Sequence, residues 1–158
     1  MKKKMGCLSV ALVGVSMLFS PVAASAATII SAANPQAIYE VARGFGAAEM
    51  GKDSTGDPKI TGMIEGRKYN IIFSSCKNNK DCKVIQFWAA WSASNVTQSQ
   101  MNEWNKGRVF GKAYLDSDND PNLELTVNLK GGVTKENLED TFDWWRVALK
   151  SFASFITD

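Results

Sequence analysis

The chain contains 158 residues, of which 45% are hydrophobic and 22% are charged, so it is long enough to form one domain around one core. It has no histidine, which excludes Ser-His-Asp and Cys-His catalytic sets and histidine metal ligands. The glycines form no phosphate-binding pattern. The acidic residues fall in turns and at the start of the last helix, where capping and solvation account for them. The sequence therefore predicts no enzyme, no cofactor and no metal site.

The first 26 residues have the pattern of a secretory signal peptide. Residues 2–4 are lysines, residues 5–19 are mostly apolar, and residues 24–26 read Ala-Ser-Ala, a small-residue cleavage motif. The apolar run of about 15 residues is shorter than the roughly 20 that a membrane-spanning helix needs. We therefore expect export to the periplasm, cleavage after Ala26, one domain over residues 27–158, and no membrane span after cleavage.

The basic character of the whole chain belongs to this segment. Cleavage would remove three of the 18 basic residues and none of the 16 acidic ones, so the net charge would change from +2 to −1. Non-specific nucleic-acid binding depends on a basic surface. We therefore expect no nucleic-acid partner.

After the signal segment, the sequence predicts helices and strands in the order α-β-β-β-β-α-β-β-α. Residues 27–33 are interpreted as a flexible lead. Asn34 and Pro35 then form a good start for a helix, and Gly44 and Gly46 end it. Four strands are predicted next, at residues 47–50, 59–64, 69–75 and 84–93. The last of these strands carries aromatic residues on both faces, as a central strand does.

The second half of the chain gives the most regular patterns. Thr97 caps a predicted short helix that ends near residue 106, and a polar link joins strands 109–115 and 123–129 in an antiparallel hairpin. Thr134 caps a long terminal helix. The large apolar residues of this helix share one narrow face and are Leu138, Phe142, Trp145, Leu149, Phe152 and Ile156. We predict an α+β fold, with an antiparallel sheet flanked by helices and covered by the terminal helix.

Cys76 and Cys82 flank the tip of a predicted hairpin. In an exported protein, an even pair of cysteines at short spacing predicts a disulfide bond. A redox-active pair is the alternative, but the C-x-x-C spacing and a helix start that would lower a thiol pKa are both missing. Cys7 lies in the signal segment.

Asp116, Asp118 and Asp120 have the D-x-D-x-D spacing of a calcium loop. An EF-hand loop also requires a glycine next and an acidic residue at its twelfth position, where this chain has Pro121 and Val127. An exposed turn explains the aspartates, and weak calcium binding stays open as the alternative. The turn at residues 53–58 resembles this one.

Trp144 does not fit the apolar face of the terminal helix. At about 100° per residue it lies about 120° away from that face, on a flank with Thr141, Ala148 and Phe155. This flank either packs on another helix of the domain or forms a surface for a partner or a second copy. The candidate partner-binding residues are Trp144 and Phe155, with Arg146 at the edge and Trp104 and Trp88 as weaker candidates.

Several segments together resemble the YbjN-domain proteins, in particular the exported, cysteine-paired proteobacterial type. These segments are DSTGDPKI, the cysteine hairpin followed by VIQFWAA, NEWNKGRVFGKAYLD, DPNLELTVNLKGGVT and DTFDWWR. The resemblance extends from residue 34 to residue 152 and is most specific over residues 104–146.

The resemblance implies a fold similar to type III secretion chaperones, often dimeric, and a role as a sensory-transduction or stress regulator, without catalytic residues. We therefore expect a non-enzymatic periplasmic binding or regulatory module with a protein or peptide partner or a second copy of itself. One alternative is a structural envelope protein without a specific ligand. Another is a thiol–disulfide redox protein that uses Cys76 and Cys82.

Overall fold

The computed structural model describes residues 26–92 and 95–157, so the predicted signal peptide up to residue 25 lies outside it. The described chain folds into helices and antiparallel strands, which confirms the predicted α+β class. The helices are α1 (Pro35–Phe45), α2 (Gln98–Gly107) and α3 (Lys135–Phe155). The main sheet has the order β2-β3-β4-β5-β7-β6. Its strands are β2 (Ala48–Lys52), β3 (Pro58–Ile64), β4 (Arg67–Ser74), β5 (Val84–Ala90), β6 (Lys112–Leu115) and β7 (Pro121–Asn128).

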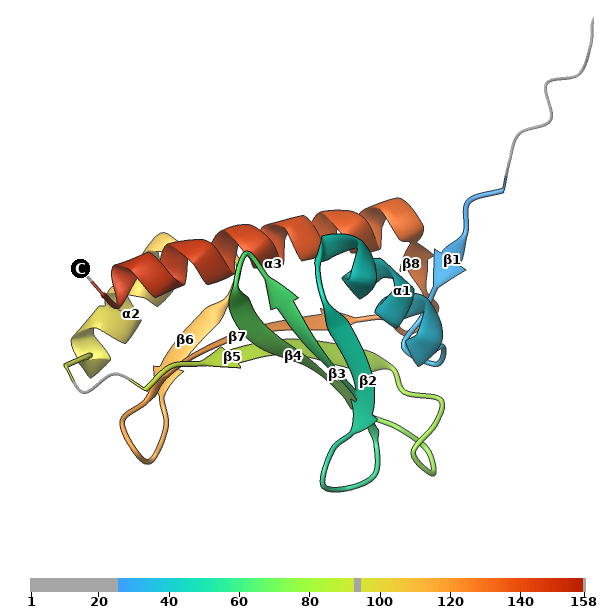
Figure 1. Cartoon of the computed structure of the whole chain (residues 1–158), viewed down its shortest axis with the longest axis horizontal. Coiled ribbons are helices and arrows are strands. Elements are labelled where there is room, and N and C mark those ends of the chain that lie inside the picture. Colours follow the sequence, from blue (N-terminus) through green and yellow to red (C-terminus); the bar gives the residue numbers. More distant parts are fainter. Residues whose placement is uncertain (1–25, 93–94, 158) are drawn as a thin grey trace, which may run out of the picture.

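The helices cover one face of the curved main sheet (Figure 1). The long helix α3 lies lengthwise across this face, with α1 beside its first half and α2 near its end. Alternation along β5 fits this arrangement, because Ile85, Phe87 and Ala89 are buried under the helices while Gln86 and Trp88 point to the other face. Since β5 pairs with both β4 and β7, the prediction of a central strand here is confirmed.

The core forms where the apolar face of α3 meets the middle of the sheet. Phe142 and Trp145 are fully buried, as expected, and both pack on Phe87 of β5, with ring centroids 4.9 Å and 5.5 Å away. Tyr69 of β4 completes the group at 6.3 Å from Trp145. Thr134 caps the helix by accepting a hydrogen bond from the backbone N–H of Asn137. The prediction that this helix covers the sheet is confirmed.

The expectation of a flexible lead at residues 27–33 is wrong. Residues Ile29–Ile30 form β1, which pairs with β8 (Val133–Thr134), the short strand just before α3. Ile30 is 4% exposed and Ala32 is completely buried. The local sequence of this segment shows no strand pattern. It is held in place by the burial of these side chains and by its pairing with a strand about 100 residues later.

The predicted strand 109–115 starts too early. The strand begins at Lys112, and Val109 is 92% exposed in the connection that precedes it. Gly111 has a φ of +83°, in the left-handed region that glycine adopts readily, and this turns the chain before the sheet begins. The apolar residues Val109 and Phe110 therefore lie outside the sheet.

The two similar turn sequences adopt the same structure. Asp53 Oδ1 accepts hydrogen bonds from the backbone N–H groups of Thr55 (2.9 Å) and Asp57 (3.0 Å) in the β2–β3 turn. Asp116 Oδ1 accepts the equivalent bonds from Asp118 (3.0 Å) and Asp120 (2.9 Å) in the β6–β7 turn. The first aspartate of each turn thus accepts hydrogen bonds from the backbone of its own turn. The described residues contain no cluster of three acidic or cysteine side chains placed to hold a metal ion.

A disulfide bond joins Cys76 and Cys82 in the β4–β5 connection, as the sequence predicts. The tip of this connection contacts the neighbouring β2–β3 turn through Asn79, whose Nδ2 donates to the backbone oxygen of Thr55 (3.1 Å) and to Asp57 Oδ1 (2.8 Å). The disulfide therefore closes a loop that also connects two hairpins.

Removing the disulfide is expected to lower stability. A loop this short gives about 2 kcal/mol on the chain-entropy model, so a Cys76→Ala/Cys82→Ala variant should lose about that much unfolding free energy. Urea denaturation would measure the loss. Reduction of the unmodified protein is the control and should have the same effect, and an unchanged denaturation midpoint after reduction would contradict the prediction.

The two turn aspartates are expected to make stability depend on acid pH. The pKa of each carboxyl group lies below the ordinary 3.8. For Asp53 the chief cause is the hydrogen bond from the Thr55 hydroxyl, and for Asp116 it is the hydrogen bond from the backbone N–H of Asp120. A carboxyl group with a lowered folded-state pKa stabilises the fold above its unfolded pKa, and this contribution is lost as the pH falls through the folded value. Between about pH 6 and about pH 2, the unfolding free energy should therefore fall less in an Asp53→Asn/Asp116→Asn variant than in the unmodified protein. Equal falls in urea titrations would count against this account.

Candidate functional site

A hollow of about 340 Å³ lies between α3 and the connection from α2 to β6. Four large apolar side chains around it are exposed: Val109 (92%), Val147 (49%), Trp144 (46%) and Phe110 (38%). We call this feature the Trp144 hollow. Its lining residues are Trp104, Gly107, Arg108, Val109, Phe110, Trp144, Val147, Ala148 and Ser151.

One wall of the hollow is the α2–β6 connection. At its own start, α2 is capped by Thr97 and Gln100, which form a capping box. The Asn105 side chain of α2 donates to the backbone oxygen of Ala113 in β6 (2.9 Å) and accepts from its N–H (2.8 Å), so α2 is fixed to β6 and the two ends of the connection are held together. The intervening segment, residues 108–111, must therefore bulge outward, and it places Phe110 against α3.

The other wall is the flank of α3 that carries Trp144. The ring of Trp144 packs against that of Phe110, tilted by 35° with the centroids 4.5 Å apart, and its indole N–H donates to Asp140 Oδ2 at 3.1 Å. Nearly half of the side chain stays exposed after these contacts. Val147, one turn further along α3, extends the apolar surface.

Trp104 and Phe155 lie at the C-terminal end of the hollow. Trp104 is 2% exposed and contacts Phe152 and Phe155, with ring centroids 4.9 Å and 5.5 Å away. The guanidinium group of Arg108 lies over its ring at 4.8 Å from the centroid. Phe155 therefore packs on a second helix, as one of the two interpretations of this flank expected, whereas Trp144 packs on a loop and remains half exposed.

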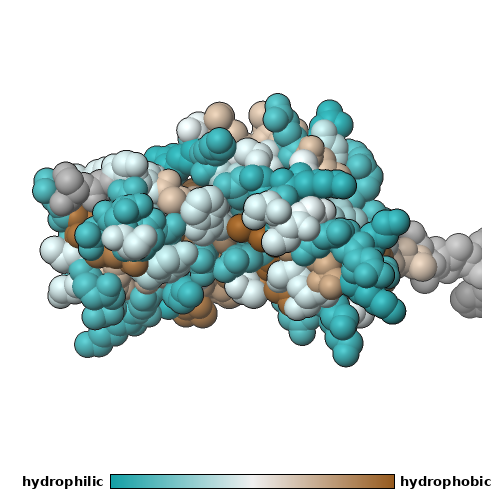
Figure 2. Space-filling view, turned by 90° about the horizontal axis from the view of Figure 1, so that it is seen from below, coloured by the Kyte–Doolittle hydropathy of each residue, from teal (hydrophilic) through white to brown (hydrophobic). Residues whose placement is uncertain are grey.

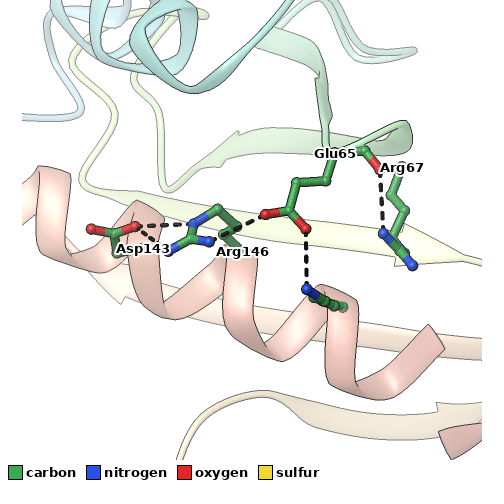
Figure 3. A network of polar contacts seen from close by, with 5 residues as sticks. Glu65, Arg67, Asp143 and Arg146 are labelled. Carbon is green, nitrogen blue, oxygen red and sulfur yellow. Dashed lines mark hydrogen bonds and ion pairs between the residues drawn. The ribbon is translucent and has the colours of Figure 1, made fainter. Parts of the chain in front are cut away.

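Arg146 lies on the opposite flank of α3, because two residues turn the helix by about 200°. Figure 3 shows its guanidinium between Asp143 of the same helix, at 3.0 Å, and Glu65 of the β3–β4 turn, at 3.2 Å. These hydrogen bonds, led by the one to Asp143, raise the pKa of Arg146. Lys150 also approaches Glu65, at 4.0 Å. The structure thus places Arg146 in an ion-pair network outside the Trp144 hollow.

Trp88 also lies away from the hollow, on the sheet face that the helices leave open. It is half-buried, and its indole N–H donates to Asn122 Oδ1 at 2.9 Å. On the same face, the Tyr114 hydroxyl donates to Glu124 Oε1 at 2.6 Å. Burial is the main cause, and this hydrogen bond the second cause, of the rise in the pKa of Tyr114 to about 12. Figure 2 shows hydrophilic and intermediate side chains over most of this side of the molecule, with groups of hydrophobic ones between them.

The geometry of the hollow suits the burial of an apolar group. Its lining is dominated by aromatic and aliphatic side chains, which is typical of binding sites. Within residues 26–92 and 95–157, no helix is long and apolar enough to cross a membrane.

The family model for YbjN, described as a putative bacterial sensory transduction regulator, matches residues 34–157. The chain belongs to the YbjN family. The description is that of a regulator, and the match confirms the resemblance to the YbjN-domain proteins. No curated protein sequence matches the chain.

The sequence analysis missed the exposed apolar residues Val109, Phe110 and Val147 of the hollow in this YbjN domain, and also Arg108. Val109 and Phe110 had been assigned to a strand, although Gly107 and Gly111 on either side are a signal for an exposed connection. Val147 follows Trp144 by three residues, which places it on the adjacent helix surface.

The neighbouring tryptophans of the YbjN domain should respond differently to truncation. Trp145 is completely buried, so Trp145→Ala should cost about 3–5 kcal/mol of unfolding free energy. Trp144 is 46% exposed, so Trp144→Ala should cost less than about 1.5 kcal/mol, mainly from the lost ring contact with Phe110. Chemical denaturation of both variants would measure the difference. Equal losses would mean that Trp144 is a core residue.

Proposed function

We propose that this YbjN-family protein is a non-enzymatic regulator that acts in the periplasm by binding a protein through the Trp144 hollow. The observation that carries the proposal is the exposure of four large apolar side chains around one hollow. Contiguous apolar surface is disfavoured on an isolated soluble protein, and where it occurs it marks an interaction site.

The residue types at the hollow support protein binding. Tryptophan and arginine are enriched among the residues that dominate binding energy at interfaces, and Trp144 and Arg108 both line the hollow. Full burial of one large apolar side chain contributes roughly 1.5–3 kcal/mol. Two or three such anchors, after the cost of association, are consistent with a regulated, reversible contact.

The non-enzymatic and periplasmic parts of the proposal have separate support. The whole sequence lacks histidine, the residue most used for general acid–base catalysis. The signal-peptide pattern of residues 1–26 favours export, as does a disulfide, which persists in oxidising compartments. A redox role is less favoured, because the C-x-x-C spacing and a helix start beside the cysteines are missing.

A photo-crosslinking residue at position 144 of the exported protein tests the proposal in living cells. The matched control is position 63, because Met63 is 47% exposed on the open sheet face while Trp144 is 46% exposed on α3. We expect a defined adduct from position 144 and none from position 63. A Val109→Asp substitution in the same hollow should abolish the adduct, since it places a charge in an apolar contact.

Two results would speak against binding through the hollow. One is a folded protein that gives no adduct from position 144. The other is an adduct that survives Val109→Asp, because its partner would then contact α3 without entering the hollow.

A further inference from the structure

We propose that the partner at the Trp144 hollow is a different protein, which adds an extended, acidic segment as a strand to the open edge of β7 beside residues 125–128. This inference rests on the proposed binding role of the hollow and names the form of the segment that binds there. The backbone groups at this edge of the sheet lead to it.

The strand β7 is longer than the strand that covers its outer side. On that side β6 pairs with residues 121–124 of β7, whereas β5 pairs with residues 122–128 on the inner side. Residues 125–128 of β7 therefore have a neighbouring strand on one side only. A strand that ends without a partner on one side presents unpaired backbone groups, which are a template for another chain.

Two residues of this stretch direct their backbone groups outward. Successive residues of a strand inside an antiparallel sheet bond the two neighbouring strands in turn. The N–H of Leu129 donates to the backbone oxygen of Lys83 on the β5 side (2.8 Å), so the odd-numbered residues of β7 face β5. The N–H and C=O groups of Thr126 and Asn128 then face away from β5. Within the described part of the chain no backbone group bonds to them, and both residues are exposed.

A second hollow, of about 510 Å³, lies beside this open edge. Its walls include Leu125 and Thr126 of β7 and, across from them, Val109 and Gly111 of the α2–β6 connection. It exists because Gly111, with its φ of +83°, turns the connection away from the line that β6 would otherwise follow along β7. Val109 lines both this hollow and the Trp144 hollow. One extended segment can therefore contact Trp144 and continue along β7.

The other two edges of the sheet are protected. The backbone N–H and C=O of Ala113, on the outer side of β6, both bond the side chain of Asn105. The edge strand β2 carries the exposed charged residues Glu49 and Lys52, and charged side chains on an edge strand oppose pairing. Residues 125–128 of β7 have neither form of protection. Main-chain hydrogen bonds to such an edge supply affinity, and alternate side chains supply specificity.

The charges along this path favour an acidic segment. Arg108 lies at the Trp144 hollow and Lys130 follows β7 by two residues, so an exposed basic group lies at each end. Among the described residues neither of them has an ion-pair partner, whereas Lys112 is paired with Glu124. A segment with carboxylates at its ends complements this pattern. A second copy of the chain would bring the same basic groups to the contact, and this favours a different protein.

A proline at position 126 tests the strand addition. Proline has no N–H, and because the N–H of Thr126 faces outward, Thr126→Pro leaves the hydrogen bonds between β7 and β5 in place. With the photo-crosslinking residue at position 144 of the exported protein in living cells, Thr126→Pro should lower the yield of the partner adduct about tenfold or more, since a main-chain hydrogen bond is lost. Thr126→Val is the matched control. It changes the side chain but keeps the N–H, and it should leave the yield unchanged.

A charge reversal tests the acidic character of the segment without a proline. Lys130→Glu places a carboxylate at the end of the open edge and should lower the adduct yield about threefold or more. Lys68→Glu makes the same change on the open sheet face and should have no effect. Urea denaturation of each variant shows that it is folded. If Thr126→Pro is not folded, Lys130→Glu and Asn128→Pro, which removes the other outward N–H, decide the question.

Several outcomes would overturn the inference and leave the proposed function standing. One is a folded Thr126→Pro or Lys130→Glu protein that keeps the full adduct yield. Another is an equal loss in Thr126→Val, which would assign the effect to the side chain. An adduct at twice the mass of the chain would show a second copy in place of a different protein. The absence of any adduct from position 144, before these substitutions are made, would refute the proposed function and this inference with it.

Discussion

The packing of Trp145 and Phe142 on Phe87 sets the position of α3, and the other features of the molecule depend on it. Tyr69 extends this aromatic group across β3, which is possible because residue 62 is glycine. A Cβ atom at Gly62 would lie 2.4 Å from Tyr69 Cζ, far inside van der Waals contact. The sheet thus provides a close-fitting surface for one face of α3, and this surface fixes the rotation of the helix about its own axis.

With that rotation fixed, the two flanks of α3 take different roles. On one flank Arg146 and Lys150 connect the helix to Glu65 in the β3–β4 turn (Figure 3). On the other flank Trp144 contacts the α2–β6 connection through Phe110 and remains half exposed. Exposed ion pairs add little stability, so the core holds the helix, and the flanks are free to differ.

The sequence was a good guide wherever local pattern decides structure. The apolar face of α3, the caps at Asn34, Thr97 and Thr134, and the Cys76–Cys82 bond were all predictable, because each depends on spacing or on neighbours within a few residues. The pairing of β1 with β8 was not, since its stabilising contacts come from a distant part of the chain. The hollow was half predictable: Trp144 is conspicuous as an off-face tryptophan, whereas the outward turn of Val109 and Phe110 depends on Gly111 and on the attachment of α2 to β6.

The adjacency of Trp144 and Trp145 explains how one helix can stabilise the core and also present the exposed side chain on which the proposed recognition depends. Because successive residues on a helix point about 100° apart, burying Trp145 completely forces Trp144 to the edge of the core, where it can be exposed without disturbing the packing. Its backbone is held by its neighbour, and its ring is held by Phe110 and Asp140. A binding residue fixed in this way loses little conformational entropy when a partner arrives. The rigidity of the core would thus favour the binding that we propose for the Trp144 hollow.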